Sequence, residues 1–384
     1  MKIARVRATP LNVPVVLDAA GMEKKTSLSA CIVQVETDDG LVGHGFTAIT
    51  EEEIVAAAIN GVAAHALVGE DPLAHERLWE RLYWLLSPRG QTGYASHAIA
   101  ALDIALWDLK GKFFKQPIHA LLGGARRKVP VYTTFGFGAY DRDELAAAAK
   151  WWVSRGHRRL KMVVGHHGLQ RRDEPRPLGE VIAEDVRRVR AVRDAVGEGV
   201  DLYVDANCSL DSFHAARLAR AIEEFDLSLF EEPVKENDIE VLKDLKTRTR
   251  ISLAAGQNEG LAWRFRDLII SRAIDVVQPN VTIGGGYTQC IRIAGLASAC
   301  NMPMANGGAW AHHNMHLHAG LANGGLVEYH YAAVKVCEAI YGPLPAPVEG
   351  WLELPEEAGL GFSPDENLVK GLAKLPTSRG KGKA

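Results

Sequence analysis

Three oxygen-bearing side chains recur at an even interval in the second half of the chain. Asp205 precedes Glu231 by 26 positions, and Glu231 precedes Gln257 by another 26, each after a short apolar run. Adjacent carboxylates repel each other unless a proton or a cation lies between them. Carboxylate and amide oxygens together suit a hard cation such as Mg²⁺. One acidic residue at a strand end is often only a helix cap, but three in register favour a metal site, with Glu259 as the alternative to Gln257.

A lysine and a pair of histidines are the candidates for acid–base chemistry. Lys161 lies inside the apolar run RLKMVV (159–164). An unpaired ammonium is costly to bury, which favours a functional role for this lysine. His312 and His313 open a helical stretch, from which either could act as an acid or a base near neutral pH. The alternative for both histidines is a place at the surface or at a helix cap.

The elements that must position these residues follow a regular order after about residue 128. Short apolar runs alternate with longer stretches of helical spacing, which predicts parallel strands joined by helices, and eight such strands close into a barrel. A doubly wound open sheet is the alternative, but no glycine-rich phosphate loop follows the first run. Side chains at the carboxyl ends of barrel strands converge on one site. The expected strands are 129–137, 159–164, 201–207, 227–233, 251–256, 273–279, 302–307 and 325–331.

The first third of the chain predicts a smaller α+β unit. Residues 1 to about 40 have the composition of strands and end in the turn signal Asp38-Asp39-Gly40, and residues 51–122 have helical spacing. We therefore expect an N-terminal domain over 1–125 and a barrel over 126–335. The remaining segment, 336–384, is expected to return to the first domain, and its basic end (378–384) to be disordered.

Composition excludes several classes of protein. The 384 residues are 47% hydrophobic and 24% charged, with a net charge of −3, so a sizeable core is expected and nothing calls for nucleic acid or an anionic membrane. Polar residues and prolines interrupt the N-terminal segment, which argues against a signal peptide or a spanning helix. Five cysteines, with no CxxC pair, favour reduced thiols in a cytoplasmic protein.

Several motifs in order resemble one known family. They are ALDIALWDLKGK (101–112), VDANCSLD (204–211), FEEP (230–233), AAGQNEG (254–260) and QPNVTIGGGYT (278–288). Together they resemble the enolase superfamily, in its mandelate racemase-like acid-sugar dehydratase branch. The resemblance spans nearly the whole chain. It implies an α/β fold, a modified (β/α)7β TIM barrel, with a capping domain built from the N-terminal region and the C-terminal tail.

The resemblance also implies a shared half-reaction. Mg²⁺ and cationic groups bind a small carboxylate substrate, a base removes the proton α to the carboxylate, and preplaced positive charge stabilises the enediolate. By motif, Asp205 and Glu231 would be metal ligands, with Glu232 as their neighbour. Asn207 and Glu328 would contact the substrate. Relatives are commonly even-numbered homo-oligomers, often octamers, which sets the expectation for this chain.

The usual bases of the family are replaced. A second lysine usually stands where this chain has Val163, and an Asp–His pair usually stands at Asn280 and Gly307-Gly308. The third ligand position usually carries glutamate, where this chain has Gln257. We therefore expect Lys161 to bind or activate the carboxylate and one of the His312/His313 pair to transfer protons.

Two further residues are candidates for substrate binding. Lys24 lies in the segment 17–28, which corresponds to a loop that covers the substrate in the family, and Trp310 precedes the histidine pair. The leading interpretation is dehydration of an aldonate or aldarate to a 2-keto-3-deoxy acid, because elimination needs only one competent face. The alternatives are a racemase or epimerase of the same branch, and a metal-binding barrel without turnover.

Overall fold

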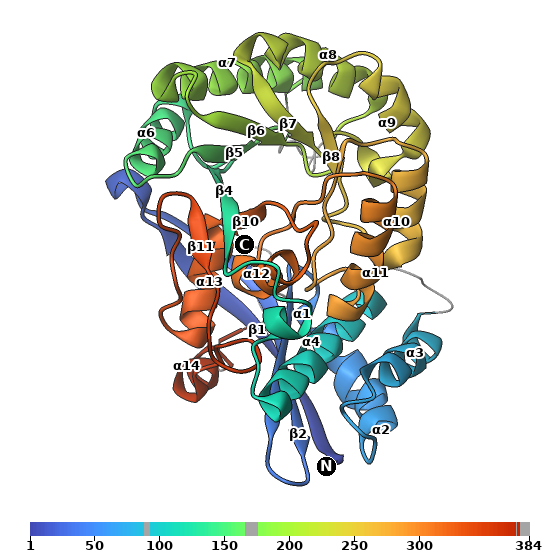
Figure 1. Cartoon of the computed structure of the whole chain (residues 1–384). Coiled ribbons are helices and arrows are strands. Elements are labelled where there is room, and N and C mark those ends of the chain that lie inside the picture. The colour runs from blue at the N-terminus through green and yellow to red at the C-terminus, as the bar shows by residue number, and fades with distance from the viewer. Residues whose placement is uncertain (88–92, 166–175, 374, 377–384) are drawn as a thin grey trace.

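The computed structural model describes residues 1–87, 93–165, 176–373 and 375–376. A curved parallel sheet with helices outside it forms one part, and an antiparallel sheet covered by helices forms the other (Figure 1). The expected α/β barrel with an α+β cap is therefore confirmed. The basic segment 378–384 lies outside the described residues, as do His166 and His167 in the segment after the second barrel strand.

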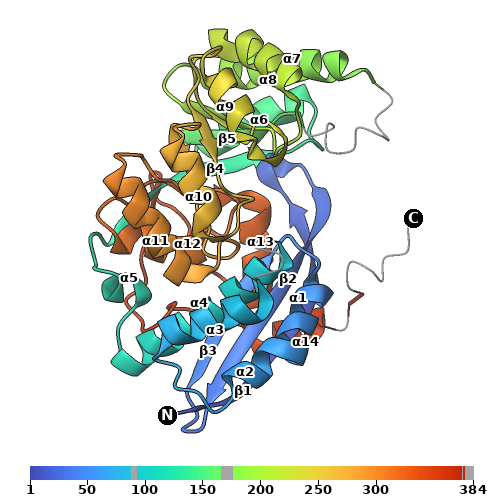
Figure 2. The same cartoon turned by 90° about the vertical axis from the view of Figure 1, so that its right-hand side faces the viewer.

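Long strands with apolar residues on their covered face build the sheet of the cap. β1 (Ile3–Leu17), β2 (Lys24–Thr37) and β3 (Val42–Ala48) lie in that order and run antiparallel. The predicted turn joins β2 to β3, where Gly40 has a φ of +87°, a conformation that glycine adopts without a steric penalty. The far ends of β1 and β2 reach up to the barrel (Figure 2).

One helix of the cap is buried along most of its length and lies on the sheet. This helix, α4, contacts β3 closely because Gly43 and Gly45 have no side chains, and a Cβ on Gly45 would lie 1.8 Å from the Ala101 carbonyl oxygen. No helix among the described residues is long and apolar enough to cross a membrane. The helices of this region are α1 (Glu52–Ala58), α2 (Ala64–Leu67), α3 (His75–Leu86), α4 (Tyr94–Phe114) and α5 (Ile118–Leu121).

The parallel strands of the barrel follow the predicted order, with one exception. The segment 302–307 was expected to be a regular strand, but only Met304 forms a β-bridge there, to Val277. This segment nevertheless closes the ring, because Ala305 N–H donates to Val277 and Asn306 N–H donates to Leu326. The strands, in the order β10-β4-β5-β6-β7-β8-β9, are β4 (Lys128–Gly136), β5 (Arg159–Val163), β6 (Asp201–Asp205), β7 (Leu227–Glu231), β8 (Leu253–Ala255), β9 (Val276–Val277) and β10 (Val327–His330).

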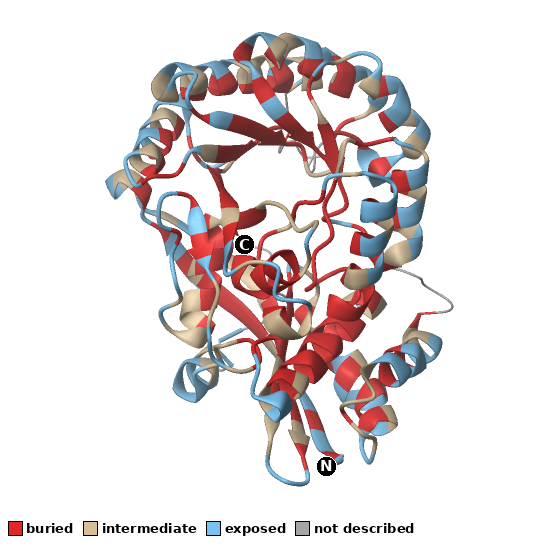
Figure 3. Cartoon of the chain, viewed as in Figure 1, coloured by how far each residue is buried: buried red, intermediate tan, exposed pale blue. Residues whose placement is uncertain are grey.

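The helices outside the barrel bury their apolar faces against the strands, and the strands are buried on both faces (Figure 3). Local signals start several of these helices. Asp141 accepts a hydrogen bond from the Glu144 N–H and completes a capping box at the start of α6, while Asp211 caps α8. The helices are α6 (Arg142–Val153), α7 (Leu178–Val196), α8 (Ser212–Ile222), α9 (Ile239–Lys246), α10 (Leu261–Ile270), α11 (Gly286–Ala299), α12 (Ala311–Gly320) and α13 (Tyr331–Tyr341).

The C-terminal segment returns to the cap, as expected. α14 (Glu366–Leu372) places Val369 and Leu372 against a cluster of buried residues drawn from β1, β2 and α13. β11 (Trp351–Glu353) pairs with β4 in the antiparallel direction. The segment therefore joins the cap to the barrel through a shared apolar core.

Candidate active site

A buried ammonium group lies at the centre of the carboxyl-terminal ends of the barrel strands. The Nζ of Lys161 is 3.0 Å from Asp205 Oδ2, 2.7 Å from Glu231 Oε1 and 2.9 Å from Glu328 Oε1. All four side chains are essentially buried. We call these four residues the Lys161 cluster, and four of the residues singled out from the sequence are thus brought together.

Strand register explains why these side chains meet. Asp205 of β6 lies opposite Glu231 of β7, and β5 pairs with β6 on its other side. Adjacent residues in a strand point to opposite faces, so alternate residues enter the barrel interior. Tyr203 lies in that interior, packed against Tyr132, and Asp205, two residues further on, points the same way at the open end.

Negative charge exceeds positive charge in this part of the interior. Burial raises the pKa of Glu231 well above its usual value, and Asp205 and Glu328 add to the rise, although the Lys161 ammonium opposes it. Burial and the nearby Asp205 also raise the pKa of Glu232. Burial disfavours the ammonium form of Lys161, but its three carboxylate partners outweigh this and hold its pKa well above the usual range. The carboxylates here therefore need more positive charge than one lysine supplies.

Gln257 lies against the carboxylates, and Glu259 does not. The Nε2 of Gln257 is 3.2 Å from Asp205 Oδ2 and 3.2 Å from Glu232 Oε2. Glu259 instead forms an ion pair with Arg264, with 2.9 Å between Arg264 Nε and Glu259 Oε2. The geometry thus favours Gln257 as the third oxygen donor. It would ligate through Oε1, because Nε2 can only donate.

The donor set fits a hard divalent cation. Asp205, Glu231 and Gln257 bring carboxylate and amide oxygens together at neighbouring strand ends, which is the chemistry that Mg²⁺ prefers. Within the described part of the chain, no three acidic, histidine or cysteine side chains already stand in a metal-binding arrangement. Asp205 and Glu231 share the Lys161 ammonium instead.

Glu232 is held by its own set of donors and in turn positions Gln257. Its Oε1 accepts from Asn237 Nδ2 at 3.1 Å and from the Asn258 N–H at 3.1 Å. Its Oε2 accepts from the Cys208 thiol at 3.2 Å, as well as from Gln257. Glu232 is therefore a fixed acceptor for the amide of Gln257.

This contact predicts a strong coupling between positions 232 and 257. Gln257→Glu should lower the unfolding midpoint in chelator, because it places a carboxylate against Asp205 and Glu232. Adding Glu232→Gln should restore part of the loss, since the amide and the carboxylate then exchange places. A double-mutant cycle of urea unfolding should give a coupling energy of about 1–3 kcal/mol. Additive effects, within about 0.5 kcal/mol, would contradict the contact.

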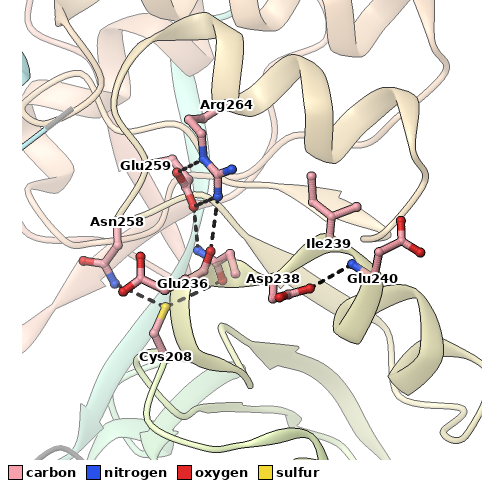
Figure 4. Close-up of a pocket in the computed structure, with 9 residues that line it drawn as sticks. Cys208, Glu236, Asp238, Ile239, Glu240, Asn258, Glu259 and Arg264 are labelled. Atoms are coloured by element: carbon pink, nitrogen blue, oxygen red, sulfur yellow. Dashed lines mark hydrogen bonds and ion pairs between the residues drawn. The ribbon is translucent and has the colours of Figure 1, made fainter. Parts of the chain in front are cut away.

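A cavity of about 550 Å³ lies beside this network, between the loops that follow β6, β7 and β8 (Figure 4). Cys208, Asn258 and Arg264 line it, and Glu259 points to Arg264 there. The members of the Lys161 cluster do not line this cavity. Glu259 therefore lines the cavity and is not part of the Lys161 cluster.

At the positions where the family usually carries its bases, this chain has residues with structural roles. The Nδ2 of Asn280 donates to the carbonyl oxygens of Gly307 and Gly308, at 2.8 and 2.9 Å. Its Oδ1 accepts from the Thr282 N–H at 2.9 Å. Val163 is a buried apolar residue at the end of β5. Asn280 thus ties the end of β9 to the segment before α12.

The structure does not bring the predicted histidine pair to the Lys161 cluster. His312 Nε2 donates to the Pro345 carbonyl at 2.8 Å, and the ring of His313 stacks on Phe46 of the cap, 4.7 Å between centroids. Burial lowers the pKa of both rings, and that of His313 falls well below its usual value. Neither contacts a member of the cluster, so their geometry lends no support to a catalytic role: α12 turns this end toward the cap.

Trp310 and Lys24 are also engaged elsewhere. Trp310 is buried and packs edge-on against Phe46, with 4.8 Å between ring centroids. Lys24 forms an ion pair with Glu144 at the start of α6, with 2.7 Å between Nζ and Oε1. Asn207 does meet the cluster, through its backbone N–H, which donates to Asp205 Oδ1 at 2.8 Å. The first two residues therefore join the cap to the barrel, and the third orients a carboxylate.

Three residues near the cluster were not singled out from the sequence. Gln278 Nε2 donates to Glu231 Oε2 at 2.9 Å, and the hydroxyl of Thr134 donates to Glu328. His330 ends β10, two residues after Glu328. All three lie at or near strand ends, so the rule that located Asp205 and Glu231, applied to every strand, would have found them.

Comparison with known families agrees with this geometry. Residues 2–123 match the mandelate racemase / muconate lactonizing enzyme N-terminal domain, and residues 144–368 match the enolase C-terminal domain-like family. The chain belongs to the mandelate racemase / muconate lactonizing enzyme family. The resemblance of its motifs to the enolase superfamily is thereby confirmed.

Relatives in this family include lyases and isomerases that act on sugar acids. The chain is 29% identical to arabinonate dehydratase of Saccharolobus solfataricus over 337 residues, which cover 86% of this chain and 87% of the relative. It is 32% identical to 3,6-anhydro-alpha-L-galactonate cycloisomerase of Streptomyces coelicolor over 75% of this chain and 76% of the relative.

A solved relative carries the expected cation. The crystal structure of L-talarate dehydratase from Polaromonas, complexed with Mg and L-glucarate, superimposes with a TM-score of 0.83 and is 30% identical, covering 97% of this chain and 98% of the other. The expected cofactor, Mg²⁺, is thus confirmed at the level of the family.

Proposed function

We propose that this enzyme removes water from an acid sugar, an aldonate or aldarate, in a Mg²⁺-dependent reaction that gives a 2-keto-3-deoxy acid. The observation that carries the proposal is the Lys161 cluster itself. One buried ammonium joins the predicted ligands Asp205 and Glu231 to Glu328, the residue expected to meet the substrate carboxylate. Such a site can bind an anion and a cation side by side.

The residues would divide the work of binding. Asp205, Glu231 and Gln257 would hold Mg²⁺, which when bound supplies positive charge beside the substrate carboxylate and so makes the neighbouring C–H more acidic. Lys161 would turn its ammonium from the protein carboxylates to the substrate carboxylate. Glu328 would hydrogen-bond the same group, and two carboxyls in contact need a shared proton. Asn207 would keep Asp205 in orientation.

The residues on the face that usually carries the Asp–His pair favour dehydration over racemisation. Racemisation needs an acid–base group on each side of the substrate carbon, and the face that usually carries the Asp–His pair has Asn280 and two glycines. In dehydration a base on one face would take the proton from C2 and return it to the departing C3 hydroxyl, which leaves as water. The resulting enol would lose the proton of its C2 hydroxyl and gain one at C3 to become the keto acid. One face of the site can serve both steps.

Ring opening by a cycloisomerase or epimerisation is the second candidate, since a relative of 32% identity is a cycloisomerase. Both reactions begin with the same removal of a proton α to a carboxylate. Exchange of substrate hydrogen with deuterated water, without loss of water, would identify an isomerase.

A keto-acid assay of the purified chain with Mg²⁺ against a panel of aldonates and aldarates tests the proposal. We expect one or a few acids to yield a keto acid, and we expect chelator to abolish the product and added Mg²⁺ to restore it. The control is the same panel with Ca²⁺, which accepts a looser geometry than Mg²⁺. Binding of Mg²⁺ without product from any acid, and without deuterium exchange, would leave only the barrel without turnover.

A further inference from the structure

His330 occupies a position in line with Lys161 across two neighbouring strands. In the parallel pairing, His330 of β10 lies opposite Thr134 of β4, and Thr134 lies opposite Lys161 of β5. Residues in register across parallel strands point to the same face of a sheet. Thr134 points to the cluster, because its hydroxyl donates to Glu328. His330 therefore faces the same end of the barrel interior, one layer above Glu328.

One ring nitrogen of His330 is already used by the backbone. His330 is the N-cap of α13, and its Nδ1 accepts a hydrogen bond from the Ala333 N–H at 3.3 Å. A nitrogen that accepts has no proton, so the proton of the neutral ring lies on Nε2. The side chain thus presents an N–H donor away from the helix, and no hydrogen-bond partner for Nε2 exists among the residues that the structure describes.

The surroundings of the ring keep it neutral. Phe137 lies 5.1 Å away, centroid to centroid. Burial lowers the pKa of His330, and the Lys161 ammonium acts in the same direction, while Glu328 and Asp205 oppose them. These three charged groups, on its own strand and on β5 and β6, are those among the described residues that shift the pKa of the ring most.

We propose that His330 is a substrate-contacting residue whose neutral Nε2–H donates a hydrogen bond to a hydroxyl oxygen of the substrate, beside the carboxylate held at Lys161. The inference rests on the proposed function and extends it to the chemistry recognised. A hydroxyl on C2 or C3 is the group that lies next to the carboxylate of an aldonate or aldarate. His330 is not the base in this arrangement, because its unprotonated nitrogen faces Ala333 and not the substrate.

The proposal predicts which acids the site selects. A donor that faces the barrel interior and is left without an acceptor disfavours any ligand that lacks the hydroxyl. Acids with hydroxyls on both C2 and C3 should therefore be preferred over their deoxy counterparts, and the preference should fall when the donor is removed.

Replacing His330 by asparagine tests the Nε2–H donor apart from the role of the side chain as N-cap of α13. Asparagine is a strong N-cap residue, so His330→Asn keeps the acceptor for Ala333 but does not reach into the interior. We expect kcat/KM for the acid identified by the panel to fall about 10- to 100-fold, with the unfolding midpoint unchanged. His330→Gln, which carries an N–H at longer reach, should recover part of the loss. Tyr329→Phe, on the neighbouring residue that faces outward, is the matched control and should leave kcat/KM unchanged.

The same variants decide between donor and base. The wild type and His330→Asn should show the same pH limbs of kcat/KM between pH 6 and 8. Loss of a limb in the variant would overturn the donor assignment, and so would a kcat/KM within about threefold of the wild type.

Failure of the dehydratase proposal would not decide the His330 proposal. If the wild type turns over none of the acids, the probes are tartrate and malate in the presence of Mg²⁺, which differ by one hydroxyl. Tartrate should raise the unfolding midpoint of the wild type more than malate does, and His330→Asn should lose that difference. Equal stabilisation by the two acids, or none, in the wild type would overturn the inference.

Discussion

Replacing Lys161 by methionine should reduce turnover of the identified acid by roughly a thousandfold. Methionine keeps most of the volume of the lysine side chain and removes its charge. The ammonium is the only cation within hydrogen-bond distance of Asp205, Glu231 and Glu328 among the described residues, and in the proposed reaction it faces the carboxylate on which negative charge develops. Positive charge that is in place before the reaction starts stabilises the developing negative charge most strongly in a buried site, where water cannot replace it.

The same variant should also reveal the excess of buried negative charge. Without Lys161 the carboxylates repel each other, so the unfolding midpoint in chelator should fall and added Mg²⁺ should recover more of it than in the wild type. Steady-state kinetics and thermal unfolding with and without Mg²⁺ measure the two effects. Lys243→Met, on the exposed face of α9, is the matched control and should change neither. More than a tenth of wild-type turnover in Lys161→Met would be incompatible with the proposed role.

Acidification should destabilise the fold steeply because many of its histidines are buried in the neutral form. Burial lowers the pKa of His97 and His157 to about 4, and that of His316 and His318 to about 3. In the unfolded chain these rings titrate near 6.5. Their contribution to stability is therefore complete above pH 6.5 and is lost as the pH falls toward 4, because only the unfolded state takes up the protons.

The expected slope of the free energy of unfolding against pH follows from the number of protons that the chain takes up on unfolding. Four such histidines contribute about 5 kcal/mol per pH unit near pH 5, at about 1.4 kcal/mol for each proton and pH unit. Glu231 and Glu232, with raised pKa values, act in the opposite direction, while other buried histidines such as His312 and His313 add to the loss.

Urea unfolding at several pH values between 7.5 and 5 measures this slope. His316→Gln should reduce the slope by the contribution of one proton, because glutamine does not titrate. Glutamine can still donate to the Leu360 carbonyl, which His316 Nε2 contacts at 3.0 Å, so the hydrogen bond is kept. His65→Gln, at an exposed position of α2, should leave the slope unchanged. A stability that does not change between pH 7.5 and 5 would show that these rings titrate as they do in water.

Much of the fold and the centre of the site could be predicted from the sequence. The alternation of apolar runs with helical spacing predicted the barrel, because the periods of strands and helices are local properties of the chain. The interval between Asp205, Glu231 and Gln257 predicted their meeting, since one strand–helix repeat separates neighbouring strand ends. The segment 302–307 was the exception, because a single bridge and three backbone hydrogen bonds suffice to close the ring there.

Side-chain direction and lateral packing were decided only by the tertiary structure. His312 and His313 closely follow the barrel segment 302–307 in the chain, but α12 packs them against Phe46 of the cap and against Pro345, which lie further away in the sequence. Glu259 is a better ligand than Gln257 by charge alone, yet Arg264 holds it outside the cluster. In the sequence His330 looks like any histidine that precedes a helix. Only the register of β10 with β4, and of β4 with β5, places it on the same face as Lys161, two strands away. Residue spacing along the chain predicts where a strand ends. The partner of each side chain depends on elements that meet only in the folded protein.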